Sequence, residues 1–113
     1  MIVSLLAVGV GGFLGGVARW ALTLWPGGLR GTFAANLLAT AVLGAVIGVV
    51  GHGSLLYLAL GTGFAGALST WSTLSRELGQ LLKERRYRLL AGYASATLTA
   101  GLAMAWLTNA LLL

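Results

Sequence analysis

Hydrogen-bond donors gather in one stretch of this sequence. Three glycines at positions 61, 63 and 66 are followed by five Ser or Thr residues between positions 69 and 75. Elsewhere, Asn36 lies well inside an apolar segment with Thr40 four residues further on, and Tyr93 and Thr97 repeat that spacing. Hydroxyl and amide groups donate hydrogen bonds without carrying a charge, and no buried carboxylate is expected among them. This set therefore suits an anion better than a cation.

The remaining residues give no support to catalysis, so we do not expect an enzyme. His52 is the only histidine, the chain has no cysteine, and its glycine-rich segments lie inside apolar stretches. A side-chain metal site or a Ser–His nucleophile would need partners that are missing. A phosphate-binding glycine loop would need a lysine beside it.

The composition indicates an integral membrane protein. Of the 113 residues, 58% are apolar and only 8% are charged, whereas soluble domains carry about 25% charged residues. Four stretches can cross about 30 Å of hydrocarbon. We predict a single all-α domain, residues 1–113, with four transmembrane helices near 2–24, 33–50, 55–82 and 89–112. The alternative for the first stretch is a signal peptide, but no positive charge precedes it.

The third stretch is predicted to be broken near residues 63–69. Glycine weakens a helix by about 1 kcal/mol relative to alanine, and Ser and Thr offer the backbone competing hydrogen bonds. Within a membrane, protein or water must satisfy the carbonyl groups freed by such a break, and transporters place ion sites there. A kinked but continuous helix is the alternative.

Glycines also recur four residues apart, which lets transmembrane backbones approach each other closely. We interpret these pairs as helix-packing positions rather than as ligands. They are Gly11 and Gly15, Gly12 and Gly16, and Gly44 and Gly48.

The few charges predict the orientation of the chain. The net charge is +5, which we interpret as a topology signal rather than as a sign of nucleic-acid binding. Arg30 and the basic residues 83–88 lie in the first and third connections, which share one side of a four-span protein, so the positive-inside rule places that side in the cytoplasm. Arg76 is expected to reach the membrane interface, and Arg19 either does the same or lines an aqueous pathway.

Ordered motifs spread over most of the chain resemble the Fluc (CrcB-type) fluoride channels. The first span carries Gly12-xx-Gly15-Gly16-xx-Arg19-Trp20, and the second opens with Gly31-Thr32-xxx-Asn36. The third carries Gly63-Phe64-Ala65-Gly66-Ala67-Leu68-Ser69-Thr70-Trp71-Ser72-Thr73-Leu74-Ser75-x-Glu77, and Tyr93 in the fourth span fits as well.

The resemblance implies a fluoride-selective channel that allows passive fluoride efflux across the plasma (inner) membrane. It implies an antiparallel, dual-topology dimer with two pores, and a structural sodium ion held by the backbone carbonyls of Gly66 and Ser69. Arg19 and Glu77 are the expected supporting charges. The expected pore residues are Asn36, Trp71, Ser72, Thr73, Leu74, Tyr93 and Thr97.

Two departures from the family pattern carry predictions. The family usually has two phenylalanines where this chain has Trp71 and Leu74; the Trp ring edge is electropositive and can face an anion, but Leu offers no such edge. We therefore expect slower or altered fluoride flux, restored by Leu74→Phe.

The one-sided charge also leaves open a heterodimer with an oppositely oriented paralogue, although we favour the homodimer.

Two other classes of protein compete with the fluoride channel. A small multidrug-type proton-coupled exporter would need a membrane-embedded carboxylate in the first span, where this chain has Arg19. A structural or regulatory membrane subunit would give no reason for clustered hydroxyl groups beside a helix break.

Overall fold

The computed structural model describes residues 1–50, 54–69 and 71–112, and these residues form helices and no strand. Two long helices, α1 (Ile2–Leu24) and α2 (Gly28–Val49), form the first half of the chain. The third segment comprises α3 (Leu55–Tyr57), the π-helix η1 (Leu58–Ala65), α4 (Gly66–Leu68) and α5 (Trp71–Lys83). The long helix α6 (Tyr87–Leu112) ends the chain.

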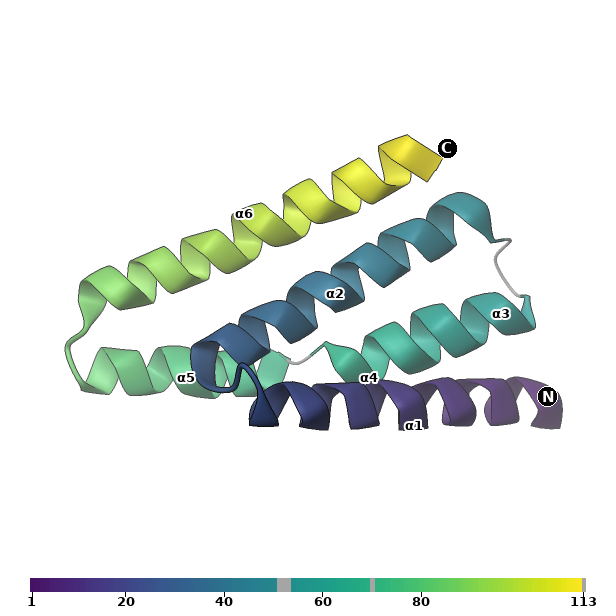
Figure 1. The fold of residues 1–113 in the computed structure, drawn as a ribbon, viewed down its shortest axis with the longest axis horizontal. Helices are drawn as coiled ribbons and strands as arrows, with labels where there is room; N and C mark the ends of the chain where they lie inside the picture. The colour runs from purple at the N-terminus through teal and green to yellow at the C-terminus, as the bar shows by residue number, and fades with distance from the viewer. Residues whose placement is uncertain (51–53, 70, 113) are drawn as a thin grey trace.

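The long segments lie side by side in two opposite directions (Figure 1). α1 and the third segment run one way, and α2 and α6 run the other. α1 packs chiefly on η1, while α2 packs chiefly on α6. The chain thus forms two helix pairs, and α2 joins them through its further contacts with η1 and α1.

α2 begins at Gly28 rather than near residue 33, because the corner between α1 and α2 is tight. Gly27 and Gly28 have φ angles of +69° and +57°, a region that glycine enters without steric cost. A Cβ atom at Gly31 would lie 2.5 Å from the carbonyl oxygen of Leu22. The chain therefore turns within a few residues, and Arg30 lies in the first turn of α2 instead of in a loop.

The third segment leaves the helical conformation at Ser69, the last residue of the expected 63–69 window. Ser54 caps α3 by accepting a hydrogen bond from the Tyr57 N–H at 3.1 Å, and the helix then widens into η1 and continues to Leu68. Ser69 is extended, with φ −71° and ψ 151°. Residues 63–68 are thus helical: Gly61 and Gly63 lie within the π-helix, and Gly66 begins α4.

Close backbone contact between α1 and η1 explains several of the glycines. A Cβ atom at Gly11 would overlap the carbonyl oxygen of Ala59, and one at Gly15 would overlap that of Phe64. On the opposite side, a Cβ atom at Gly63 would lie 2.5 Å from the carbonyl oxygen of Val8. Small residues of this kind let transmembrane helices pack closely. Gly16, by contrast, faces open space.

Three helices of the described chain are long and apolar enough to cross a membrane: Ile2–Leu24, Gly28–Val49 and Tyr87–Leu111. The third segment is divided by its break, so neither part qualifies alone. α5, with 13 residues, is about 20 Å long at 1.5 Å per residue. That length is short of the roughly 30 Å hydrocarbon core.

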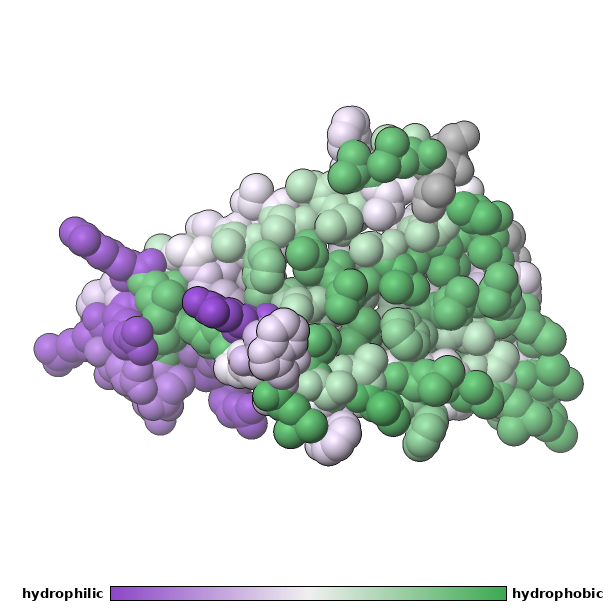
Figure 2. All heavy atoms as spheres, viewed as in Figure 1, coloured by the Kyte–Doolittle hydropathy of each residue, from purple (hydrophilic) through white to green (hydrophobic). Residues whose placement is uncertain are grey.

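The hydrophilic residues gather at one end of the molecule (Figure 2). In this view they surround the α5–α6 turn and the neighbouring α1–α2 corner, while hydrophobic residues cover the rest of the visible face. The α5–α6 turn closes with Arg85 at φ +57°. The N–H groups of Arg85 and Arg86 donate to the carbonyls of Leu82 and Leu81, at 3.1 and 3.0 Å, as in a Schellman cap.

Candidate functional site

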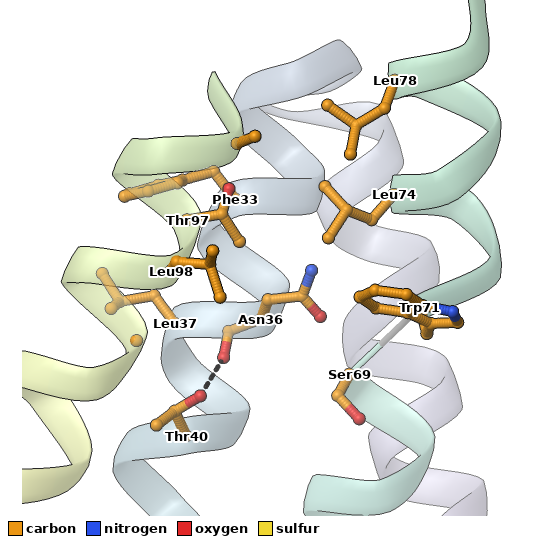
Figure 3. A pocket seen from close by; sticks show the side chains of 12 residues that line it. Phe33, Asn36, Leu37, Thr40, Ser69, Trp71, Leu74, Leu78, Thr97 and Leu98 are labelled. Carbon is orange, nitrogen blue, oxygen red and sulfur yellow. Dashed lines mark hydrogen bonds between the residues drawn. The ribbon is translucent and has the colours of Figure 1, made fainter. Parts of the chain in front are cut away.

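A cavity of about 370 Å³ lies between α2, α5 and α6, directly beside the break at Ser69. We call it the donor cavity (Figure 3). Its polar side chains come from α2, from the break and from α6, and the remaining wall is apolar. It is lined by Phe33, Asn36, Leu37, Thr40, Ser69, Trp71, Leu74, Leu78, Ala94, Thr97, Leu98 and Gly101.

Asn36 extends from α2 into this cavity toward Leu74 and Trp71 (Figure 3). Its backbone carbonyl accepts a hydrogen bond from Thr40 Oγ1 at 2.8 Å. An amide side chain both donates and accepts hydrogen bonds, so Asn36 can offer its NH₂ group to an anion in the cavity.

Thr97 contributes a second donor from α6. Its hydroxyl oxygen is buried and has no hydrogen-bond partner among the described residues, although Thr97 lines the donor cavity. A buried polar group without a partner costs about 1–3 kcal/mol, so this position calls for a ligand or a water molecule. The sequence spacing pointed to Thr97, and in the structure its hydroxyl is an unsatisfied donor.

Trp71 and Leu74 both line the donor cavity, but their exposure differs. Leu74 is 8% exposed, whereas Trp71 is 78% exposed within the single chain. Figure 3 shows the six-membered ring of Trp71 turned toward the cavity and its indole nitrogen on the opposite side. The ring edge can thus face the cavity, while the indole N–H points away from it.

A second cavity, of about 410 Å³, lies across α5 from the first, and three charged side chains line it. Two of them, Arg19 and Arg76, are exposed within the single chain, and Glu77 is partly exposed. We call this second cavity the arginine cavity. It is lined by Gly16, Arg19, Trp20, Thr23, Gly28, Gly31, Thr32, Ala35, Thr73, Arg76 and Glu77. Arg76, which we expect to reach the membrane interface, lines this cavity together with Arg19.

Glu77 connects this cavity to α6. Tyr93 is 8% exposed and its hydroxyl donates to Glu77 Oε1 at 2.9 Å. This bond fixes α5 against α6, in a cluster in which Leu74, Leu81 and Tyr93 pack together. Tyr93 itself lines neither the donor cavity nor the arginine cavity.

The periodicity of α5 separates the predicted pore residues. Residues 71, 74 and 78 share one face and line the donor cavity, while 73, 76 and 77 share another and line the arginine cavity. Ser72 and Ser75 lie on a third, exposed face. The structure therefore does not bring Ser72 to either cavity of this chain, because successive helical residues lie about 100° apart.

Sequence reasoning missed several residues of the donor cavity wall, two of which are close to a predicted site residue in the chain. Phe33 precedes Asn36 by three residues, and Leu78 follows Leu74 by four. Both share a helical face with a predicted site residue, so the same periodicity that selected the polar groups could have identified them.

Gly66, the first residue of α4, and Ser69, which caps its C-terminus, are the expected sodium ligands, and they lie within one turn of the helix end. Both are exposed within the single chain, and Ser69 Oγ donates to the Gly66 carbonyl at 3.3 Å. Carbonyl groups at a helix C-terminus carry partial negative charge, and hard cations prefer oxygen ligands. No three His, Cys, Asp or Glu side chains converge among the described residues, so a cation here would rely on these backbone oxygens.

The fold and the cavities define a small, multi-pass helical membrane protein with a donor-lined site beside an interrupted helix. A family model for the CrcB-like protein, Camphor Resistance (CrcB), matches residues 6–109. The chain belongs to this CrcB-like family.

Several curated relatives support this assignment. The chain is 48% identical to fluoride-specific ion channel FluC 2 of Corynebacterium diphtheriae over 93 residues, covering 82% of this chain and 86% of the relative. It is 37% identical to fluoride-specific ion channel FluC 1 of Geobacillus kaustophilus, covering 90% and 91%. It is 38% identical to fluoride-specific ion channel FluC of Paraburkholderia phymatum, covering 88% and 86%.

Proposed function

We propose that this chain is the subunit of a fluoride channel, which lets fluoride leave the cell passively and so relieves fluoride toxicity. The relatives named as fluoride-specific ion channels agree with the function predicted from the sequence. The observation that carries the proposal is the unpartnered Thr97 hydroxyl in a cavity shared with Asn36. A small, strongly hydrated anion needs such donors in place of its water.

The proposed route uses both cavities of the chain. Arg19 and Arg76 raise the local concentration of anions at the charged end, and Tyr93 holds the Glu77 carboxylate in place by donating a hydrogen bond to it. Asn36 and Thr97 then offer donors in the more apolar donor cavity, and the ring edge of Trp71 adds positive potential.

The proposed assembly is an antiparallel dimer of four-span subunits in the plasma membrane, with two pores. Trp71, Ser72, Gly66 and Ser69 are all exposed within the single chain, and an oppositely oriented partner would cover them. A structural sodium ion is proposed at the dimer axis, bound by the Gly66 and Ser69 carbonyls of both subunits, where it would neutralise the ends of the interrupted helices. A heterodimer with a paralogue is the alternative assembly.

Fluoride efflux from liposomes tests the proposed function. The purified chain should release fluoride, followed with a fluoride electrode, and should release no chloride. Asn36→Asp should reduce the flux, because it removes a donor and adds a negative charge. Asn109→Asp is the matched control, since Asn109 lines neither cavity.

A proton-coupled multidrug exporter is not favoured. α1 has Arg19 and no acidic residue, and the relatives are named as ion channels. Absence of fluoride efflux, together with efflux of a cationic dye against a proton gradient, would reverse this choice.

A further inference from the structure

A third hollow, of about 330 Å³, opens at the charged end of the molecule between the first turns of α2 and α6. We call it the basic hollow. Its wall is formed by Leu29, Arg30, Phe33, Leu89 and Tyr93. The donors Asn36 and Thr97 and the two arginines of the proposed route do not line this hollow, so it needs an explanation of its own.

The charged and the apolar residues of the hollow lie at different positions along the helices. Arg30 is exposed and lies in the first turn of α2, whereas Phe33 and Tyr93 lie one turn further along their helices. Leu29 and Leu89 complete an apolar wall. A ligand that fits must therefore carry a negative group at one end and hydrocarbon behind it.

The electrostatics around the opening favour an anionic group. The only ion pair in the described chain joins Arg86 and Glu84, at 3.7 Å, so the guanidinium of Arg30 has no carboxylate partner. Neither α2 nor α6 has an acidic residue in its first turn, although the positive ends of helix dipoles favour negative charge there. The basic residues of the α5–α6 turn add to the same field (Figure 2).

We propose that the basic hollow binds one anionic phospholipid, with the phosphate at Arg30 and an acyl chain along Leu29, Phe33 and Leu89. The location agrees with this ligand, since the charged end of the molecule adjoins its hydrophobic surface (Figure 2). A small inorganic anion would gain only Arg30 and would face an apolar wall, so it fits less well.

The lipid would also touch the wall of the proposed pore. Phe33 lines both the basic hollow and the donor cavity, and Tyr93 lines the hollow while bonding Glu77. An acyl chain here holds Phe33 in place from its far side. This consequence rests on the proposed function, whereas lipid binding itself does not.

Native mass spectrometry of the full chain in detergent tests the lipid site. Phosphatidylglycerol and phosphatidylcholine with identical acyl chains serve as probes, and the wild type should retain the anionic lipid preferentially. Arg30→Gln should reduce that preference about fivefold, as expected for one arginine at a membrane surface. Arg85→Gln removes the same charge from the adjacent turn without touching the hollow, and it should keep most of the preference.

A second variant separates a lipid from a free anion. Leu89→Trp keeps Arg30 but fills the apolar wall, so it should weaken retention of both lipids, and inorganic phosphate should not displace phosphatidylglycerol from the wild type. Equal losses in Arg30→Gln and Arg85→Gln, undiminished retention in Leu89→Trp, or displacement by inorganic phosphate would overturn the proposal. The assay measures no fluoride, so its failure is independent of a failure of fluoride conduction.

Discussion

The hydroxyl of Thr97 differs from those of four other threonines in its hydrogen bonding. Thr23, Thr32, Thr40 and Thr108 each donate to a backbone carbonyl three or four residues earlier, which is the usual arrangement within a helix. The Thr97 hydroxyl is buried, and no such partner satisfies it. The residue is therefore the clearest candidate for a direct contact with the ion.

Thr97→Val should lower fluoride efflux at least tenfold, because a hydrogen bond to a charged group is worth about 1.5–3 kcal/mol. Valine has the same shape and removes an unsatisfied polar group, so thermal stability in detergent should be unchanged or higher. Thr108→Val is the control: it removes a satisfied hydroxyl outside the cavity and should affect stability more than flux. A Thr97→Val channel with wild-type flux would remove this hydroxyl from the pathway.

Leu74→Phe should raise fluoride flux in the same liposome assay. Leu74 is nearly buried but borders the donor cavity, so a larger ring has space to enter, and its electropositive edge can face an anion. Leu74→Met, which keeps an apolar side chain without a ring, should leave flux near the wild-type rate. Identical rates for Leu74→Phe and the wild type would contradict the argument.

At the scale of elements, the contact between α1 and η1 sets the position of the break. Backbone atoms of the two helices meet at Gly11, Gly15 and Gly63, and this contact holds the third segment in place up to Leu68. The break at Ser69 then places Ser69 and Trp71 on the wall of the donor cavity. The geometry of the site therefore depends on glycines that touch no ion.

Gly15→Ala should destabilise the protein by about 1–3 kcal/mol, because its Cβ would overlap the Phe64 backbone and force α1 away from η1. Gly9→Ala, in the same helix but with open space around it, should be neutral or stabilising by up to about 1 kcal/mol through helix propensity. Thermal unfolding in detergent measures both. Equal stabilities for the two variants would show that the close contact is not required.

At the scale of the whole molecule, the charges gather at one end, while the break between α4 and α5 lies further along the helices (Figures 1 and 2). The donor cavity lies beside this break. A subunit with this bias would be expected to insert in one direction. The exposed Trp71 and Ser69 nevertheless call for a partner, and a homodimer with opposed subunits requires insertion in both directions. Whether the chain inserts in one direction or in both therefore decides which dimer it can form.

Terminal reporter fusions measure that orientation. If the chain forms the homodimer that we favour, a cytoplasmically active reporter and an externally active reporter fused to the C-terminus should both show activity in cells. The purified single chain should then conduct fluoride by itself. Labelling on one side only, without flux from the single chain, would favour the heterodimer instead.

The sequence alone determined the class of this protein and most of its donor set. Low charge and long apolar stretches indicate a membrane protein however the helices pack. The four-residue spacing from Asn36 to Thr40 and from Tyr93 to Thr97 places each pair on one helical face. The family resemblance, confirmed by the match over residues 6–109, supplied the fluoride function that composition could not.

Only the tertiary structure decided which donors share a cavity. It brought Asn36, Trp71, Leu74 and Thr97 together, and it separated them from Thr73 and Glu77 by the width of α5. It also shifted the helix break to Ser69. These outcomes depend on how α1, α2 and α6 pack around the third segment, and contacts between residues distant in the chain leave no local pattern in a single sequence.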